Sequence, residues 1–288
     1  MGLLDSPLVR KVRQSPRLRP AGIAAYRAVD RVLPAGTGPR VLANSMPKSG
    51  THLLATLLDG LGDLRFAGHL VAFDCGDRHD PDAKLADLSR RLKGLRNNRY
   101  LGGHLVADEA VQDRVAQSGV KLLTILRDPR AVIVSGANYV LEATQLRDRD
   151  EALALFPDKD AILRAMVFGN GEPGEKFYFP EIGERYAAYA RWWDAPMGHT
   201  VRFEDLIGGR GGGDDDRQVD EVAGVLQYLG YGADQQTSRT LAAQLFSEKA
   251  ITFRTGRIDS WREELPADLA AEVERRCPVW MDRLGYPS

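Results

Sequence analysis

The stretch Val41-Leu-Ala-Asn-Ser-Met-Pro-Lys-Ser-Gly-Thr51 predicts a buried strand that passes through a tight loop into a helix. Its apolar first half is flanked by turn residues, which is typical of a buried strand over residues 40–45. The helix is expected over residues 52–61, because leucines repeat along one helical face. These leucines are Leu53, Leu54, Leu57, Leu58 and Leu61. Since backbone N–H groups and the helix dipole favour an anion at a helix start, the stretch is a candidate phosphate-binding loop.

The residue types of this loop suit a single terminal phosphate. Gly50 allows a positive φ and a close approach of the backbone to a ligand. Lys48 adds a compact charge, and Ser49 and Thr51 add hydroxyl donors. His52 opens the helix, where it either caps the helix or lines the site. The loop is not a Walker A loop, because here the lysine precedes the glycine. An ordinary strand-to-helix turn with a capping serine is the alternative.

A second anion-binding element is predicted where an apolar strand over residues 120–126 ends in Arg127-Asp-Pro-Arg-Ala-Val-Ile-Val-Ser135. An arginine at the carboxyl end of a strand lies at the edge where open α/β sheets bind ligands. Pro129 suits the first turn of a helix, and Ser135 follows Arg127 by eight residues, about two helical turns. Arg127 and Ser135 are therefore expected to face one phosphate, which the guanidinium grips as a fork. A surface Arg–Asp pair that caps a helix is the alternative.

Further strands are predicted at residues 100–103 and 200–203, and helices alternate with the strands along the chain. This alternation predicts an α/β fold with a parallel sheet flanked by helices, of P-loop-like type. We expect a basic N-terminal arm over residues 1–20, then one domain over residues 21–288 that begins with a helix at 21–33. The glycine- and aspartate-rich run at 208–216 is predicted to be a mobile surface loop.

Composition excludes several functional classes. The formal net charge of the 288 residues is -1, so no overall field recruits nucleic acid. The two cysteines, Cys75 and Cys277, form no metal-ligand spacing, and no apolar run has the length of a membrane span. A cytoplasmic protein is expected, since no signal peptide is recognisable. The arginines of the arm lie beside leucines, which predicts weak contact with an anionic membrane surface; a solvated arm is the alternative.

Together the two elements resemble those of sulfotransferases that use 3'-phosphoadenosine-5'-phosphosulfate (PAPS). The sequence looks like a bacterial member of this family with a cytosolic-type domain. Residues 47–51 look like the family's loop for the 5'-phosphosulfate, and residues 127–135 look like its 3'-phosphate element. The family's C-terminal loop over the 3'-phosphate is matched by Phe253, Arg254, Thr255 and Gly256. Residues 202–206 resemble its aromatic-Glu-Asp-Leu segment, with Phe203 as the aromatic residue toward the nucleotide.

The resemblance implies that PAPS is the donor, that PAP is the product, and that no metal is needed. It implies an acceptor hydroxyl on a small molecule, lipid or glycan. Three positions depart from the cytosolic branch: Leu53 replaces an adenine-stacking tryptophan, Phe203 a tyrosine and Thr255 a lysine. The contacts to adenine therefore stay open, and so does the oligomeric state, because no dimerisation motif of that branch is recognisable.

Transfer of a sulfuryl group to a hydroxyl needs a base for the hydroxyl proton and a cation for the leaving phosphate. By the resemblance, His104 in Tyr100-Leu-Gly-Gly-His-Leu is the general base, with space beside it at Gly102, where the family has a lysine. Lys48 is the cation that stabilises the leaving phosphate. Glu204 is the fallback base, although a helix-capping role is equally open, and His69 is a candidate for an acceptor gate.

Two other functional classes stay open from the sequence. A P-loop kinase or NTPase with a degenerate loop is one, although the Walker lysine is absent. A non-catalytic PAP-binding protein is the other. The aromatic residues of the segment between 136 and 199 are expected to be core for the most part, with some lining an acceptor cleft.

Overall fold

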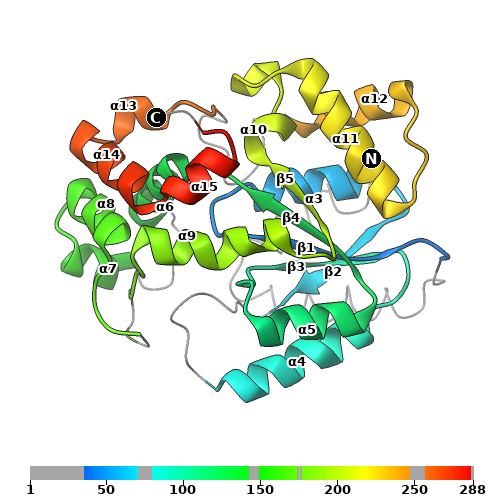
Figure 1. Ribbon diagram of the computed structural model, residues 1–288, viewed down its shortest axis with the longest axis horizontal. Coiled ribbons are helices and arrows are strands. Elements are labelled where there is room, and N and C mark those ends of the chain that lie inside the picture. The colour runs from blue at the N-terminus through cyan, green and yellow to red at the C-terminus, as the bar shows by residue number, and fades with distance from the viewer. Residues whose placement is uncertain are drawn as a thin grey trace.

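The computed structural model describes residues 36–70, 80–142, 149–173, 175, 177–246 and 257–286. Its centre is a five-stranded sheet in the order β2-β3-β1-β4-β5, in which every pairing is parallel (Figure 1). The strands are β1 (Arg40–Ser45), β2 (Arg65–His69), β3 (Arg99–Gly103), β4 (Lys121–Leu126) and β5 (His199–Arg202). The predicted α/β fold with a parallel sheet is confirmed.

Helices cover both faces of this sheet, as Figure 1 shows. Leucines and valines of α4 (Pro81–Lys93) and α5 (Glu109–Ser118) bury one face, together with Leu42, Leu101 and Leu122. The opposite face packs against α3 (Thr51–Gly60), α11 (Asp215–Leu229) and α12 (Gln235–Leu245). The central strands β1 and β4 are thus buried on both faces, which explains why they read as continuous apolar runs.

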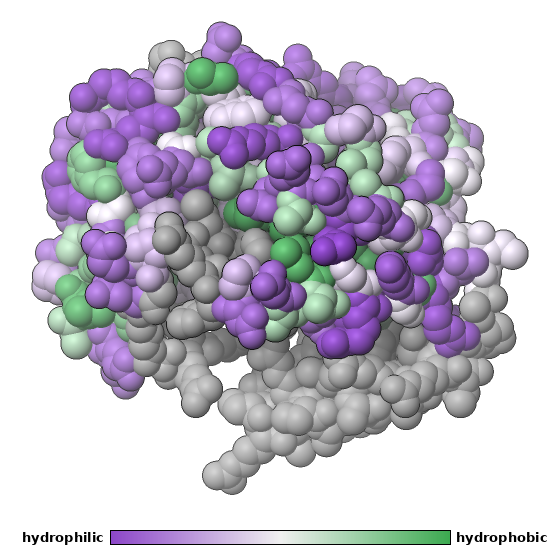
Figure 2. Space-filling model, turned by 60° about the horizontal axis from the view of Figure 1, so that its bottom comes forward, coloured by the Kyte–Doolittle hydropathy of each residue, from purple (hydrophilic) through white to green (hydrophobic). Residues whose placement is uncertain are grey.

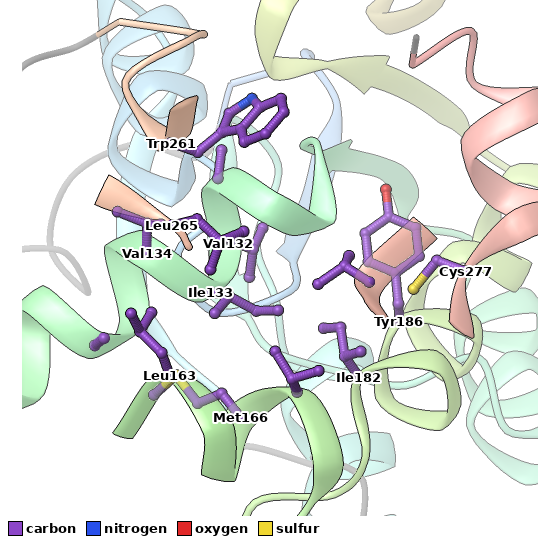
Figure 3. Close-up of a cluster of buried hydrophobic side chains, with 14 of the residues drawn as sticks. Val132, Ile133, Val134, Leu163, Met166, Ile182, Tyr186, Trp261, Leu265 and Cys277 are labelled. Carbon is purple, nitrogen blue, oxygen red and sulfur yellow. The ribbon is translucent and has the colours of Figure 1, made fainter. Parts of the chain in front are cut away.

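A third apolar cluster is formed by helices that lie beyond the carboxyl ends of β1 and β4 (Figure 3). The helices that surround it are α6 (Pro129–Glu142), α7 (Arg149–Leu155), α8 (Lys159–Phe168), α9 (Ile182–Ala190), α13 (Trp261–Glu264), α14 (Ala267–Arg276) and α15 (Pro278–Arg283). The ring of Tyr186 lies beside Cys277 and Ile182, while its hydroxyl points away from the apolar side chains. The remaining short helices are η2 (Arg191–Asp194), α10 (Phe203–Leu206) and η3 (Gly209–Gly211).

The predicted strands and the helix predicted at 52–61 are confirmed to within one residue, but one strand was missed and one expectation needs correction. Strand β2 was not predicted, because it lies at the sheet edge and has polar ends, and its pairing with β3 shifts register at Gly68. The run at 208–216 is not a structureless loop: it forms η3, and then Asp215 and Asp216 begin α11. Asp214 caps that helix by accepting a hydrogen bond from the Arg217 N–H at 2.8 Å.

Some expectations fall outside the described residues, namely the basic arm at 1–20 and the helix at 21–33. The division into an arm and one domain over 21–288 stays a prediction. Across the ranges given above, the structure contains no helix long and apolar enough to cross a membrane. On the face shown in Figure 2, hydrophilic residues dominate the coloured surface and apolar residues occur in small groups.

Candidate active site

The two predicted phosphate elements meet because β1 and β4 are neighbours in the sheet. Ser45 pairs with Ile125 at the carboxyl ends of these strands. The chain leaves β1 toward β2 at one edge and leaves β4 toward β5 at the other. This arrangement is a topological switch point, where open α/β sheets bind their ligands. The loop with Lys48 and the turn with Arg127 therefore lie side by side.

The loop between β1 and α3 has a strained backbone that packs closely against neighbouring side chains. Lys48 has a φ of 74° and Gly50 a φ of 110°, and the Ser49 N–H donates to the Met46 carbonyl at 3.1 Å. A Cβ atom on Gly50 would lie 2.7 Å from Phe203 Cδ2 and 2.9 Å from Ile125 Cδ1, so glycine is required there.

The same loop leaves polar groups that an anion would satisfy. The Oγ of Ser49 is fully buried and has no hydrogen-bond partner among the described residues. Within the described residues no side-chain hydrogen bond caps the α3 N-terminus, and the first turn of α3 holds no acidic residue. Buried polar groups without partners are rare and costly, so an anion at this helix start would stabilise the loop.

His104 lies against the end of β1, beside this loop. Its Nδ1 is 2.8 Å from the Ser45 carbonyl oxygen and 3.2 Å from Ser45 Oγ, and that hydroxyl is 2.7 Å from Thr51 Oγ1. A carbonyl only accepts hydrogen bonds, so Nδ1 donates its proton there. In that tautomer Nε2 carries the lone pair, which is the form that a general base requires.

The backbone after His104 is fixed by a buried amide. The Nδ2 of Asn44 donates to the Leu105 carbonyl at 3.0 Å, and the Leu105 N–H donates to Asn44 Oδ1 at 2.8 Å. Trp192 Nε1 donates to the same carbonyl at 2.7 Å. Asn44 is fully buried. These bonds hold the segment of His104 against β1, a role for Asn44 and Trp192 that the sequence did not indicate.

The guanidinium of Arg127 lies 4.2 Å from the centroid of the Phe203 ring. Its hydrogen bonds to carbonyl oxygens are long, 3.4 Å to Lys48 and 3.3 Å to Arg257, and its buried Nε has no described partner. Burial lowers the pKa of Arg127, and the carboxylates of Glu204 and Asp128 oppose this effect. An arginine stays charged under such a shift of its pKa. A bound anion would therefore offset the free-energy cost of removing the guanidinium from water.

Glu204 holds the turn that carries Arg127. Its Oε1 accepts a hydrogen bond from the Asp128 N–H at 3.0 Å, and its Oε2 accepts one from the Tyr286 hydroxyl at 3.1 Å. The Tyr186 hydroxyl donates to the Arg127 carbonyl at 2.9 Å. Burial raises the pKa of Glu204. Both carboxylate oxygens therefore accept hydrogen bonds that hold the turn before α6, and a role for Glu204 as the base stays a prediction.

Arg130 fixes the beginning of α6. It is fully buried, and its guanidinium contacts Asp128 through Nε at 3.0 Å and Nη2 at 2.8 Å, and Glu274 of α14 at 2.7 Å. It also lies 4.0 Å from the centroid of the Trp261 ring. These contacts tie the turn before α6 to α14.

The other predicted binding residues differ in their surroundings. Ser135 lies half-buried on α6, and His52 is exposed at the second position of α3. Phe203 is buried beneath Gly50 and Arg127. Leu53 is buried in the core and offers no exposed face for adenine. The predicted loop of Phe253, Arg254, Thr255 and Gly256 lies outside the described residues.

The surroundings of the Lys48 side chain lower its pKa. Burial and the nearby Arg127 lower the pKa of Lys48 to about 8. Its Nζ lies 4.2 Å from the centroid of the Tyr139 ring, on α6. Tyr139 was missed by sequence reasoning, although its position four residues after Ser135 places both on one helical face.

No family model matches this sequence, and no curated protein matches it. Solved structures do match its fold, among them the following three. Mouse sulfotransferase SULT7A1 complexed with PAP has a TM-score of 0.56 at 16% identity, over 88% of this chain and 87% of that one. Retinol dehydratase in complex with androsterone and the inactive cofactor PAP scores 0.52 at 15%, over 84% and 80%. A putative steroid sulphotransferase of Arabidopsis thaliana scores 0.50 at 15%, over 92% and 84%.

The chain has the sulfotransferase fold. Within this fold, the prediction that Gly102 leaves space beside His104 is wrong. A Cβ atom on Gly102 would lie 2.6 Å from His69 Nδ1, because His69 pairs with Gly102 across β2 and β3. The imidazole of His69 therefore fills the place of a side chain at position 102. In the part of this sulfotransferase fold that the structure describes, no group of three or more His, Cys, Asp or Glu side chains is arranged to hold a metal ion.

Proposed function

We propose that this protein is a PAPS-dependent sulfotransferase that moves a sulfuryl group to an acceptor hydroxyl. The observation that carries the proposal is the meeting of Lys48, Arg127 and His104 at the switch point of the sheet, in a fold shared with solved PAP complexes. A phosphate loop, a second anion element and a base are the three parts that such a reaction needs.

The two anionic ends of the donor would be held by different elements. Lys48, Ser49, Gly50 and Thr51 would bind the 5'-phosphosulfate at the α3 N-terminus, with His52 beside them. The orphaned Ser49 hydroxyl supports this assignment, since it offers a donor with no competing partner in the described chain. Arg127, Ser135 and the loop of Phe253, Arg254, Thr255 and Gly256 would bind the 3'-phosphate, and Phe203 would support Arg127 from below.

The reaction follows from the chemistry of these groups. The acceptor oxygen attacks sulfur while its proton passes to Nε2 of His104, and the bond from sulfur to the 5'-phosphate oxygen breaks. The products are a sulfate ester and PAP, and the proton leaves His104 to solvent. The Lys48 ammonium stabilises charge that develops on the leaving phosphate. A positioned general base typically contributes about 10²–10⁴-fold in rate.

The acceptor is proposed as a hydroxyl on a small molecule, lipid or glycan. Retinol dehydratase, which shares the fold, is solved with androsterone, and this supports a small-molecule acceptor here. We further propose that the protein acts in the cytoplasm without a metal, and that the arm at 1–20 makes weak contact with anionic membranes.

The test is transfer of radiolabelled sulfuryl from PAPS to a panel of phenols, sterols, lipid alcohols and glycans. We expect His104→Ala to lose about 10²–10⁴-fold in turnover and to retain PAP binding. His199→Ala is the control, because His199 lies at the amino end of β5, away from the carboxyl ends of the strands, and contacts Glu221 and Tyr228.

Each alternative predicts a different outcome of this experiment. PAP binding with no transfer to any acceptor would indicate the non-catalytic protein, and binding of magnesium–ATP in preference to PAP would indicate the kinase or NTPase. A His104→Ala variant with the turnover of His199→Ala would remove His104 from the mechanism.

A further inference from the structure

The Lys48 side chain is held by an aromatic ring rather than by a carboxylate. Its Nζ lies 4.2 Å from the centroid of Tyr139, well within the range of a cation–π contact. Among side chains that the structure describes, no carboxylate forms an ion pair with Lys48, and the charged group that acts on it is Arg127. The residue Tyr139 is 37% exposed on α6, so it lies at the surface and not in the core.

Two features of Lys48 favour an aromatic ring as the partner of its ammonium group. Its backbone has a φ of 74°, a left-handed conformation that L-residues rarely adopt, and this fixes where the side chain begins. Burial and Arg127 both disfavour its charged form. A ring face attracts the ammonium without neutralising it, whereas a carboxylate would also repel an incoming anion.

The helix that carries Tyr139 also carries Ser135 of the second phosphate element. Ser135 precedes Tyr139 by four residues, so both side chains lie on one face of α6. The turn before α6 is anchored by Arg130 to Asp128 and Glu274. The ring is therefore presented to Lys48 by an anchored helix that also positions Ser135.

We propose that Tyr139 is a positioning residue for Lys48, whose ring face holds the ammonium beside the two phosphate elements in its charged form. For the reaction this inference rests on the proposed sulfotransferase function. The contact itself does not, because it forms in the chain without donor. Tyr139 is not expected to touch the transferred group.

The contact is tested by NMR of the full chain after reductive ¹³C-methylation of its lysines, with the Lys48 signal assigned by its absence in Lys48→Arg. The ring current of Tyr139 should shift the Lys48 methyl signal upfield. We expect the shift to persist in Tyr139→Phe and to be lost in Tyr139→Leu. Tyr228→Leu is the matched control, since Lys121 Nζ lies 5.0 Å from the Tyr228 centroid, and it should move Lys121 alone.

Kinetic measurements show whether the contact between Tyr139 and Lys48 also positions Lys48 for the reaction. Tyr139→Leu should lower kcat by about 2- to 30-fold, the range of one cation–π contact, while Tyr139→Phe restores it. The Kd for PAP should change less than about twofold, because Arg127 and Ser135 are untouched. A Lys48 signal without a ring-current shift in the wild type overturns the proposal, as does a Tyr139→Leu variant with wild-type kcat. A wild-type chain that shows the shift but transfers no sulfuryl group contradicts the proposed function and leaves the contact supported.

Discussion

Replacing Gly50 with alanine tests whether the phosphate loop is built around a missing side chain. The left-handed backbone at φ 110° costs an L-residue about 1–2 kcal/mol. The added Cβ would also lie 2.7 Å from Phe203 and 2.9 Å from Ile125, and overpacking a buried site costs about 1–3 kcal/mol. The sum is about 2–5 kcal/mol in the free energy of unfolding.

Gly62→Ala is the matched control for this variant. Gly62 has a φ of 76°, but a Cβ atom there would meet nothing within 4 Å. Only the backbone strain applies, so about 1–2 kcal/mol should be lost. Urea unfolding measures both differences, and calorimetry measures PAP binding.

The two variants should differ in binding as well as in stability. Displacement of Phe203 removes the ring beneath Arg127, so Gly50→Ala should weaken PAP binding, whereas Gly62→Ala should not change it. If Gly50→Ala unfolds with the free energy of Gly62→Ala and binds PAP like the wild type, the described loop geometry is wrong.

Other perturbations address single groups. Lys48 is cationic below its pKa of about 8, so kcat/KM for the donor should fall as pH rises through 8. In Lys48→Arg the residual rate should no longer show this alkaline fall, because arginine stays charged. A fall that persists in Lys48→Arg would mean that another group causes it. Burial raises the pKa of Glu204 in the folded chain, so this carboxylate binds a proton more readily in the folded than in the unfolded state. The free energy of unfolding should therefore fall as the pH rises above 4.5, the ordinary pKa of a glutamate. Glu204→Gln should lessen this fall in urea unfolding and keep turnover within about tenfold, because its amide oxygen still accepts one of the two hydrogen bonds. Loss of turnover equal to that of His104→Ala would make Glu204 the base.

The parts of the fold that the sequence predicted are those with local signals. The apolar runs of β1 and β4 are buried on both faces, and the leucine face of α3 repeats at helical spacing. The phosphate loop is also a local signal, because Gly50 and the helix start lie within one turn of the chain. Strand β2 has no such signal, since an edge strand needs no apolar run.

The parts that the sequence did not predict depend on contacts between distant residues. Glu204 reaches Asp128, Asn44 reaches Leu105, and His69 fills the side-chain space of Gly102. None of these pairs is adjacent in sequence, and each depends on the order of the strands. The strand pairing alone brings Lys48, Arg127 and His104 together, so the constellation follows from topology and not from any one motif.

The most direct test of the central claim compares the affinities of PAP and adenosine 5'-phosphate by calorimetry on the wild-type chain and on Arg127→Ala. The two nucleotides differ only in the 3'-phosphate. A charge-assisted hydrogen bond contributes about 1.5–3 kcal/mol, which corresponds to a preference for PAP of roughly 10- to 150-fold. We expect that preference in the wild type and its loss in Arg127→Ala, with the affinity for adenosine 5'-phosphate unchanged. Equal affinity of the wild type for both nucleotides would contradict the assignment of a PAP site to the two phosphate elements.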